Sequence, residues 1–366
     1  MSRSIKRTNN KKTNLNQNIE KVITNTNNPL FNYIKPKNND MFSKMHGIDL
    51  QDLLYYIENY YLELRNCLGF DSYITFGLEL EFENAMKEHI ENELIKRSLY
   101  DAWELKHDGS LERGAEINSP ILKDTTDSWN NLKRVCSIVD ANAIIGQRSG
   151  GHIHVGTQVI GGQPESWLNF IKLWSVYENI IYRFAYGDFL TARPSMSCYA
   201  EPLTKDFWED YKKLKKCDLL DMEVIIRNIS HQKYKAVNFN NVKISDFKNI
   251  SDKNTIEFRC PNGTLNPTIW QNNVNLFVNM LLYSKSTRYN DDIIQNRRNI
   301  NKDKYSKLIW YDEIYLQQAL ELCDMLFTNN FDKVYFLRQY LKSFEINNKE
   351  LSKSKPFTKK LTIQKH

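Results

Sequence analysis

Three short segments of the chain alternate apolar and polar residues with a period of two. They are residues 77–83 (GLELEFE), 151–156 (GHIHVG) and 255–259 (TIEFR). This period predicts β-strands, because residues i and i+2 of a strand point to the same face of its sheet. Each predicted strand therefore shows bulky apolar side chains to one face and ionisable side chains to the other.

The remaining chain shows helical periodicity broken by turn residues. Apolar residues spaced three or four apart predict helices over 49–68, 84–99, 125–142, 164–186, 267–288, 311–327 and 331–344, with two shorter helices in 205–229. Further strands are expected over 103–111, 112–119 and 234–239, and a loop over 187–204. Antiparallel pairs of strands with long helices between them indicate an α+β fold.

The two ends of the chain differ from its body in composition. Residues 1–47 are rich in Asn, Lys and Thr without periodicity, which predicts a disordered leader before a folded domain over 48–345 and a basic tail over 346–366. The formal net charge is +6, yet residues 1–48 carry +7 and residues 346–366 carry +5, so the body is acidic at −6. The basic ends are expected to be solvated, and weak contact with nucleic acid or an anionic partner is the alternative.

The cysteines and the apolar stretches indicate the cellular compartment in which the protein is expected. The six cysteines are scattered without a CxxC pair, which indicates a reducing compartment, and Cys67, Cys136 and Cys323 lie in helical patterns. The N-terminus lacks the apolar segment of a secretory signal, and charged residues interrupt the longest apolar stretch, 167–190. A cytoplasmic protein without a membrane span is therefore expected.

The polar faces of the predicted strands carry the candidate chemistry. Packed carboxylates repel one another unless cations lie among them, so a pair of divalent metals is the simplest interpretation. Acid oxygens with an occasional imidazole favour Mg²⁺, or Mn²⁺, over Zn²⁺. An exposed polar strand face and an ordinary ion pair are the structural alternatives. The ionisable residues share faces in three pairs: Glu79 with Glu81, His152 with His154, and Glu257 with Arg259.

Two further acids extend this set. Glu116 lies in an alternating segment over 114–120, and Asp108 lies in an Asp-Gly turn, where the turn's own hydrogen bond is the alternative to a metal-binding role. Mg²⁺ held by carboxylates usually works with substrate phosphates, which points to nucleotide chemistry. The sequence holds neither GxxxxGK(S/T) nor GxGxxG, so the alternative way to hold a metal–nucleotide is a sheet that carries the carboxylates.

Taken in this order, the motifs resemble those of a known family. GLELEFE at 77–83, HDGSL at 107–111 with GAEINSPIL at 114–122, GHIHVG at 151–156 and TIEFRCPNGTLNP at 255–267 are similar to the amidoligases of the glutamine synthetase and glutamate–cysteine ligase superfamily. YKAVNFNN at 234–241 resembles the segment that precedes the Glu-x-Arg strand there. The resemblance covers residues 70–290. It implies a curved antiparallel sheet with metal-bound ATP on its concave face and helices on its convex side.

The resemblance also implies roles for individual residues. Metal ligands are implied at Glu79, Glu81, Glu116, His152 and Glu257, and contacts to the nucleotide at His154, Arg259, Arg193 and Lys235. A direct part in catalysis is implied for Glu79, Glu81, Glu116 and Arg259. Glu83 and Asp108 are either further ligands or bystanders.

The implied reaction joins a carboxylate to an amine. ATP drives formation of an amide or isopeptide bond through an acyl phosphate, between small-molecule or peptide substrates that the sequence does not identify. The alternatives are a phosphotransferase and a non-enzymatic module that binds nucleic acid or protein on the same fold. The acidic body argues against nucleic acid. Relatives differ in oligomeric state, so the resemblance implies none.

Overall fold

The computed structural model describes residues 14–31, 39–189, 192–204, 216, 219–229, 234–246, 254–301 and 313–341. The chain divides into two compact units. One consists of Met1–Leu62, Ile309–Ser343 and Lys359–His366, and the other of Glu63–Leu308 and Phe344–Thr358. Every predicted site residue lies in the second unit, which also contains the whole sheet.

The sheet of the second unit is open and has six strands, all paired antiparallel. The three period-two segments form its centre, as the alternation predicted, and the hairpin predicted over 103–119 forms one edge. The spatial order is β2-β3-β1-β4-β6-β5. The strands are β1 (Phe76–Phe82), β2 (Glu104–His107), β3 (Ala115–Asn118), β4 (Gly151–Gly156), β5 (Val237–Asn238) and β6 (Thr255–Phe258).

The helices of the second unit largely follow the predicted pattern. Thr125 caps the N-terminus of α5, where its side chain accepts a hydrogen bond from the Ser128 amide. α6 begins with Pro164, a residue suited to the first helical turn. The helices are α4 (Lys87–Lys96), α5 (Thr126–Asn142), α6 (Pro164–Ala185), α7 (Met196–Tyr199), α9 (Leu219–Ile229), α10 (Pro267–Ser284) and α11 (Asp291–Asn301).

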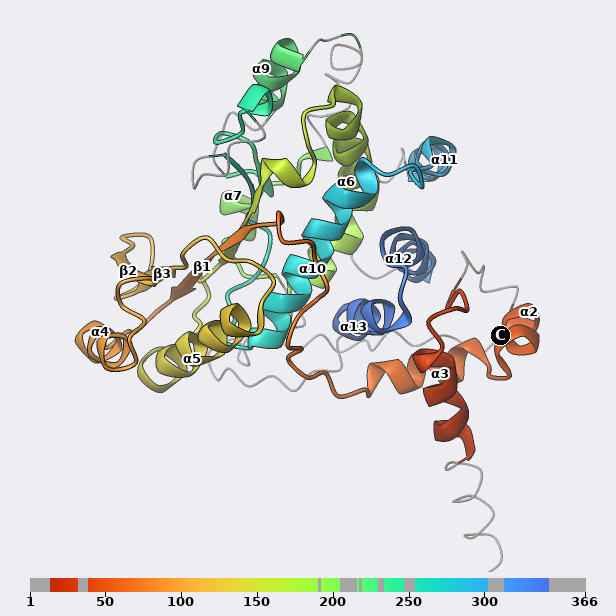
Figure 1. Cartoon of the computed structure of the whole chain (residues 1–366), viewed down its shortest axis with the longest axis horizontal. Helices are drawn as coiled ribbons and strands as arrows, with labels where there is room; N and C mark the ends of the chain where they lie inside the picture. The colour runs from red at the N-terminus through yellow and green to blue at the C-terminus, as the bar shows by residue number, and fades with distance from the viewer. Residues whose placement is uncertain are drawn as a thin grey trace, which may run out of the picture. The chain divides into compact units, whose positions relative to one another are not determined.

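The apolar face of the sheet forms the core against three of these helices. Phe258 of β6 stacks on Phe277 of α10 with ring centroids 4.1 Å apart, and it also contacts Trp174 of α6. Phe76 of β1 stacks on Trp129 of α5. Because α5, α6 and α10 cover this face (Figure 1), the opposite, polar face is the one that remains for a site. The mixed helix–sheet class is confirmed, whereas the specific glutamine-synthetase-like fold and the curvature stay predictions.

The described helices of the first unit correct one prediction. Residues 14–24 and α2 (Asn39–His46) are helical, although we expected all of 1–47 to be disordered. A short apolar stripe, Ile19, Val22 and Ile23, is buried there, and its Asn-rich surroundings concealed it. Asn330 fixes this segment through hydrogen bonds to backbone carbonyls. The other helices of this unit are α3 (Leu50–Glu58), α12 (Glu313–Leu326) and α13 (Asn330–Leu341).

A few elements differ from their predicted limits. α3 ends at Glu58 rather than at 68, so Cys67 is exposed outside any helix instead of buried in one. The expected loop over 187–204 contains α7, and α11 was not predicted because its sequence is largely polar. Residues 205–215 and the tail over 346–366 lie outside the described residues. Within the described ranges, every helix is too short or too polar to cross a bilayer.

Candidate active site

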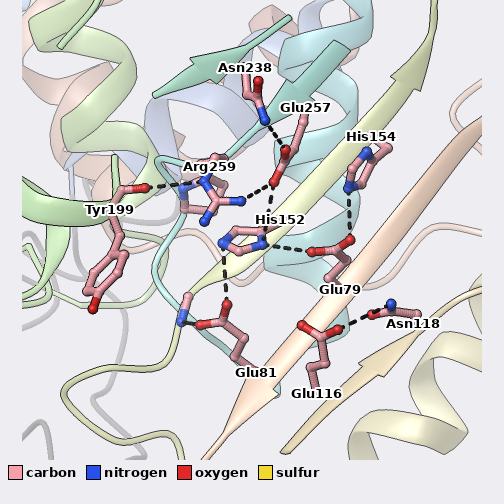
Figure 2. Close-up of polar contacts among 12 residues, drawn as sticks. Glu79, Glu81, Glu116, Asn118, His152, His154, Tyr199, Asn238, Glu257 and Arg259 are labelled. Atoms are coloured by element: carbon pink, nitrogen blue, oxygen red, sulfur yellow. Dashed lines mark hydrogen bonds and ion pairs between the residues drawn. The ribbon is translucent and has the colours of Figure 1, made fainter. Parts of the chain in front are cut away.

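The strand register lines up the predicted site residues in neighbouring rows of one face. Glu79 of β1 lies between Asn118 of β3 and His152 of β4. Glu81 is paired with Glu116 on β3. On the other side of the Glu79 row, Glu257 of β6 lies between His154 of β4 and Asn238 of β5. Figure 2 shows these side chains gathered on the same face of the sheet.

Glu79, His154 and Glu257 form the first of two groups with the geometry of a metal site. Each offers one ligand atom, and these atoms lie within 4.8 Å of one another. His154 Nε2 lies 3.0 Å from Glu79 Oε1, and the Thr255 hydroxyl contacts the other ring nitrogen, Nδ1, at 3.1 Å. Asn238 donates to Glu257 Oε2 at 2.7 Å, which fixes that carboxylate. We call this set the β4–β6 group.

Glu81, Asp108 and Glu116 form the second group, again with ligand atoms within 4.8 Å. The turn between β2 and β3 brings Asp108 to the two glutamates. Asp108 Oδ1 also accepts the Ser110 amide at 2.7 Å, so the residue combines the turn role and the ligand position that the sequence left as alternatives. The Gly150 amide donates to Glu81 Oε2 at 2.5 Å. We call this set the β1–β3 group.

His152 lies between the two groups. Its Nδ1 is 2.8 Å from Glu79 Oε2, and its Nε2 is 3.4 Å from Glu81 Oε1. The ring is almost fully buried. Among the described residues, His154 rather than His152 has the ligand-atom spacing of a metal group. His152 nevertheless contacts acids of both groups, because its Nδ1 also lies 3.7 Å from Glu257 Oε1. Glu83 belongs to neither group, and its Oε1 accepts the Glu112 amide.

The crowding of charges changes the pKa values of three groups. Burial alone would raise the pKa of Glu79, but hydrogen bonds with His152 and His154 hold it well below its usual range. Burial and then the charge of Glu79 raise the pKa of Glu116 to about 7. Burial lowers the pKa of His154, yet the hydrogen bond with Glu79 and the charges of Glu257 and Glu79 together outweigh this and raise it. Within the β1–β3 group, Glu116 is therefore only partly ionised at neutral pH without a cation.

The three predicted cationic residues occupy different positions. Arg259 contacts Glu257 through Nη1 and the Tyr199 carbonyl through Nε, at the edge of the site (Figure 2). Arg193 is buried, and its two Nη groups donate to the carbonyls of Pro261 and Arg259, which leaves its buried Nε without a hydrogen-bond partner among the described residues. Lys235 is paired with Glu201 at 3.0 Å.

A cavity of about 280 Å³ opens over these residues. The acids and the histidine that line it are Glu79, Glu81, Asp108, Glu116 and His152. The remaining lining residues are Arg148, Arg193, Arg259, Tyr199 and Tyr234, together with Ser110. The lining of the cavity thus combines anionic residues with cationic and aromatic ones. Sequence reasoning missed Ser110, Arg148, Tyr199 and Tyr234 as site residues. In the structure each lies in a turn, a loop or a short helix, although strands were expected over 103–111 and 234–239, which contain Ser110 and Tyr234.

The residues present fit the divalent metals that the sequence predicted. Each group offers carboxylate oxygens, one of them with an imidazole, which is the donor set that Mg²⁺ and Mn²⁺ accept. A cation in the β1–β3 group would offset the burial and the repulsion that raise the pKa of Glu116. The orphaned Nε of Arg193 beside the cavity is a donor suited to an anionic ligand.

Comparison with known proteins agrees with this geometry. Residues 97–281, just over half of the chain, match the family described as "Putative amidoligase enzyme". The chain belongs to this amidoligase family. No curated protein matches the chain. The match begins after β1, so Glu79 and Glu81 of this amidoligase lie outside it, and it is the pairing of β1 with β3 and β4 that brings them to the site. Placement in the wider glutamine synthetase superfamily stays a prediction.

Proposed function

We propose that this amidoligase is an ATP-dependent carboxylate–amine ligase that forms an amide or isopeptide bond through an acyl phosphate. The proposal depends on one observation: two groups of metal-ligand side chains lie on one sheet face of a chain that belongs to an amidoligase family. Mg²⁺ held by carboxylates commonly completes its coordination with substrate phosphates. A cavity lined by these acids and by arginines is suited to a metal–nucleotide.

The residues of the chain would bind and orient the reactants. Glu79, Glu257 and His154 would hold one ion and Glu81, Glu116 and Asp108 the other, while His152 would fix the carboxylates of both groups. Arg259 would contact phosphate oxygens from the rim of the cavity. Arg193 lines the cavity but already donates to two carbonyls, and Lys235 is already paired with Glu201, so we expect smaller contributions from these two residues.

The proposed reaction has two balanced steps. An oxygen of the substrate carboxylate bonds to the γ-phosphorus of ATP as the bond from that phosphorus to ADP breaks. The amine nitrogen then bonds to the carbonyl carbon, inorganic phosphate leaves, and the amine loses a proton. When bound, the metal ions neutralise charge on the phosphate oxygens during the first step. Arg259 would stabilise the same oxygens by fixed, preorganised hydrogen bonds.

Calorimetric titration tests the nucleotide site without knowledge of the substrates. Mg²⁺ with a non-hydrolysable ATP analogue is titrated into the parent protein and into a Glu81→Gln, Glu116→Gln variant. We expect binding by the parent and loss of binding by the variant. Glu104→Gln is the matched control, since Glu104 lies on neighbouring β2 but is paired with Lys106 outside both groups. A folded parent that binds no nucleotide with Mg²⁺ or Mn²⁺ would contradict the proposal.

Product analysis then separates the ligase from the alternatives. Parent protein with ATP and pools of carboxylic acids and amines is expected to release ADP and phosphate only when an acid and an amine are both present. A phosphorylated product that persists in the presence of amines would indicate a phosphotransferase instead. Salt-sensitive DNA binding without nucleotide binding, lost on deletion of residues 1–48, would indicate a binding module.

A further inference from the structure

Arg148 is the arginine of the cavity lining whose guanidinium is least engaged. Arg193 already donates to two backbone carbonyls, and Arg259 contacts Glu257 and a carbonyl. Arg148 is exposed, and its one hydrogen bond within the described residues is a long one, 3.5 Å from Nη1 to the Ser110 carbonyl. A guanidinium has five N–H donors, so nearly all of the hydrogen-bonding capacity of Arg148 is available to a ligand.

The backbone that carries Arg148 is nevertheless fixed on both sides. Before it, Ile144 exchanges two backbone hydrogen bonds with Glu83, the residue that follows β1. After it, Gly150 donates to the Glu81 carboxylate and accepts from the Glu81 amide. Ser149 accepts from the Gly263 amide and, through its hydroxyl, from the Gly146 amide. The loop therefore presents an exposed side chain from a fixed Cα, and the fixed backbone lowers the entropy lost on binding.

The neighbours of Arg148 show where its ligand would lie. Arg148 and Ser110 border the same cavity as all three acids of the β1–β3 group. Arg148 nevertheless forms no ion pair with Glu81, Asp108 or Glu116, each of which is a described residue. Its charge is thus not used to neutralise these acids. An anion bound to an ion in that group would lie in the cavity that the Arg148 guanidinium also lines.

Resting on the proposed function, we infer that Arg148 binds the γ-phosphoryl group of the nucleotide. The planar fork of a guanidinium matches two phosphate oxygens at once, which a single ammonium does not. The γ-phosphoryl group is the part of ATP that ADP lacks. Arg148 therefore distinguishes the nucleoside triphosphate from the diphosphate, and its loss would leave affinity for ADP nearly unchanged.

The test compares two nucleotides and two arginines. The parent, Arg148→Gln and Arg113→Gln are titrated with Mg²⁺ and either ADP or a non-hydrolysable ATP analogue. Arg113 is the matched control because it lies in the neighbouring β2–β3 loop and is exposed, yet its guanidinium donates to Asn84. For Arg148→Gln we expect affinity for the ATP analogue to fall by about tenfold or more and affinity for ADP to change by less than about twofold. Arg148→Lys should restore part of the loss.

Three results would overturn the inference. Equal affinity of parent and Arg148→Gln for the ATP analogue would show that Arg148 does not contact the γ-phosphoryl group, although the proposed function would stand. An equal loss of affinity for ADP and for the ATP analogue in Arg148→Gln would show that Arg148 contacts the other phosphates of the nucleotide. Failure of the parent to bind either nucleotide would instead remove the proposed function, and this inference with it. Thermal unfolding of each variant confirms that it is folded.

Discussion

Glu79 and His152 face each other directly across β1 and β4, with His152 Nδ1 2.8 Å from Glu79 Oε2. The second ring nitrogen of His152, Nε2, points to Glu81, which lies two residues after Glu79 on β1. One imidazole thus contacts a carboxylate of each candidate metal group. The two groups share this side chain, so we expect the binding of an ion to one group to affect binding to the other.

Replacement of His152 by alanine tests this coupling. Loss of the ring frees Glu79 and Glu81 together, so we expect the affinities of both metal ions to fall, each by about 10- to 100-fold. His154→Ala is the comparison, because His154 contacts Glu79 but belongs to the β4–β6 group alone. Mn²⁺ titration followed by electron paramagnetic resonance measures both sites. If His152→Ala weakened a single class of sites, the coupling would be absent.

Asp108→Asn is expected to weaken one ion and spare the other. The asparagine side chain keeps an oxygen that can accept the Ser110 amide, so the turn between β2 and β3 should persist. The variant removes a negative charge from the β1–β3 group, whose ion should bind about 10- to 100-fold more weakly. The same Mn²⁺ titration should then show one tight site and one weak site. Two unchanged sites would place Asp108 outside the metal centre.

The strands and their polar faces could be predicted because alternation is a local property. Leu78, Leu80 and Phe82 had to point away from Glu79 and Glu81 once the segment was a strand, and the structure agrees. The alternation within one segment does not give the register in which that strand pairs with its neighbours. That Glu79 is opposite His152 while His154 is opposite Glu257 follows from strand pairing, which depends on contacts distant in the sequence.

The cationic and aromatic lining of the cavity was harder to predict for a physical reason. Arg148 and Tyr199 lie in a loop and in a helix of four residues, where no period assigns a side chain to a face. Their positions depend on tertiary hydrogen bonds, such as the Gly150 amide to Glu81 and Arg259 to the Tyr199 carbonyl. The signal in the sequence was limited to an arginine in the polar turn just before the His-x-His strand.

Glu116 gives a pH prediction for the metal-free protein. Its folded pKa of about 7 lies above the ordinary value of 4.5, so between these values the folded chain keeps a proton that the unfolded chain has released. The free energy of unfolding should therefore decrease as pH rises from about 4.5 to about 7. Glu116→Gln lacks this ionisation, so its stability should fall less over the same range.

Urea unfolding of both proteins at several pH values measures this difference, and Mg²⁺ provides a second arm. Metal ions bind the deprotonated carboxylate, so saturating Mg²⁺ should stabilise the parent increasingly as pH rises through about 7. Stability curves of the parent and Glu116→Gln that stay parallel without metal would contradict the raised pKa. The comparison cancels the contribution of His154, whose raised pKa acts in the same direction.

Glu178, deep in α6, is expected to hold the cavity wall in place. Its carboxylate accepts hydrogen bonds from the Trp174 indole, the Leu203 amide and both the amide and hydroxyl of Thr204. Burial raises its pKa, and these donors oppose the rise. The neighbouring Tyr182 hydroxyl donates to the Ala200 carbonyl. α6 thus fixes residues 200–204, which follow Tyr199 of the cavity directly.

Glu178→Ala would leave several buried donors without an acceptor, and each such donor costs about 1–3 kcal/mol. We therefore expect the free energy of unfolding to fall by about 3 kcal/mol or more, measured by urea denaturation at pH 7. Glu178→Gln keeps the shape and one acceptor oxygen, so its loss should be smaller. Glu165→Ala, at the exposed start of the same helix, is the control and should change stability by less than about 1 kcal/mol. If Glu178→Ala matched this control, residues 200–204 would be held by the Tyr182 contact and apolar packing instead.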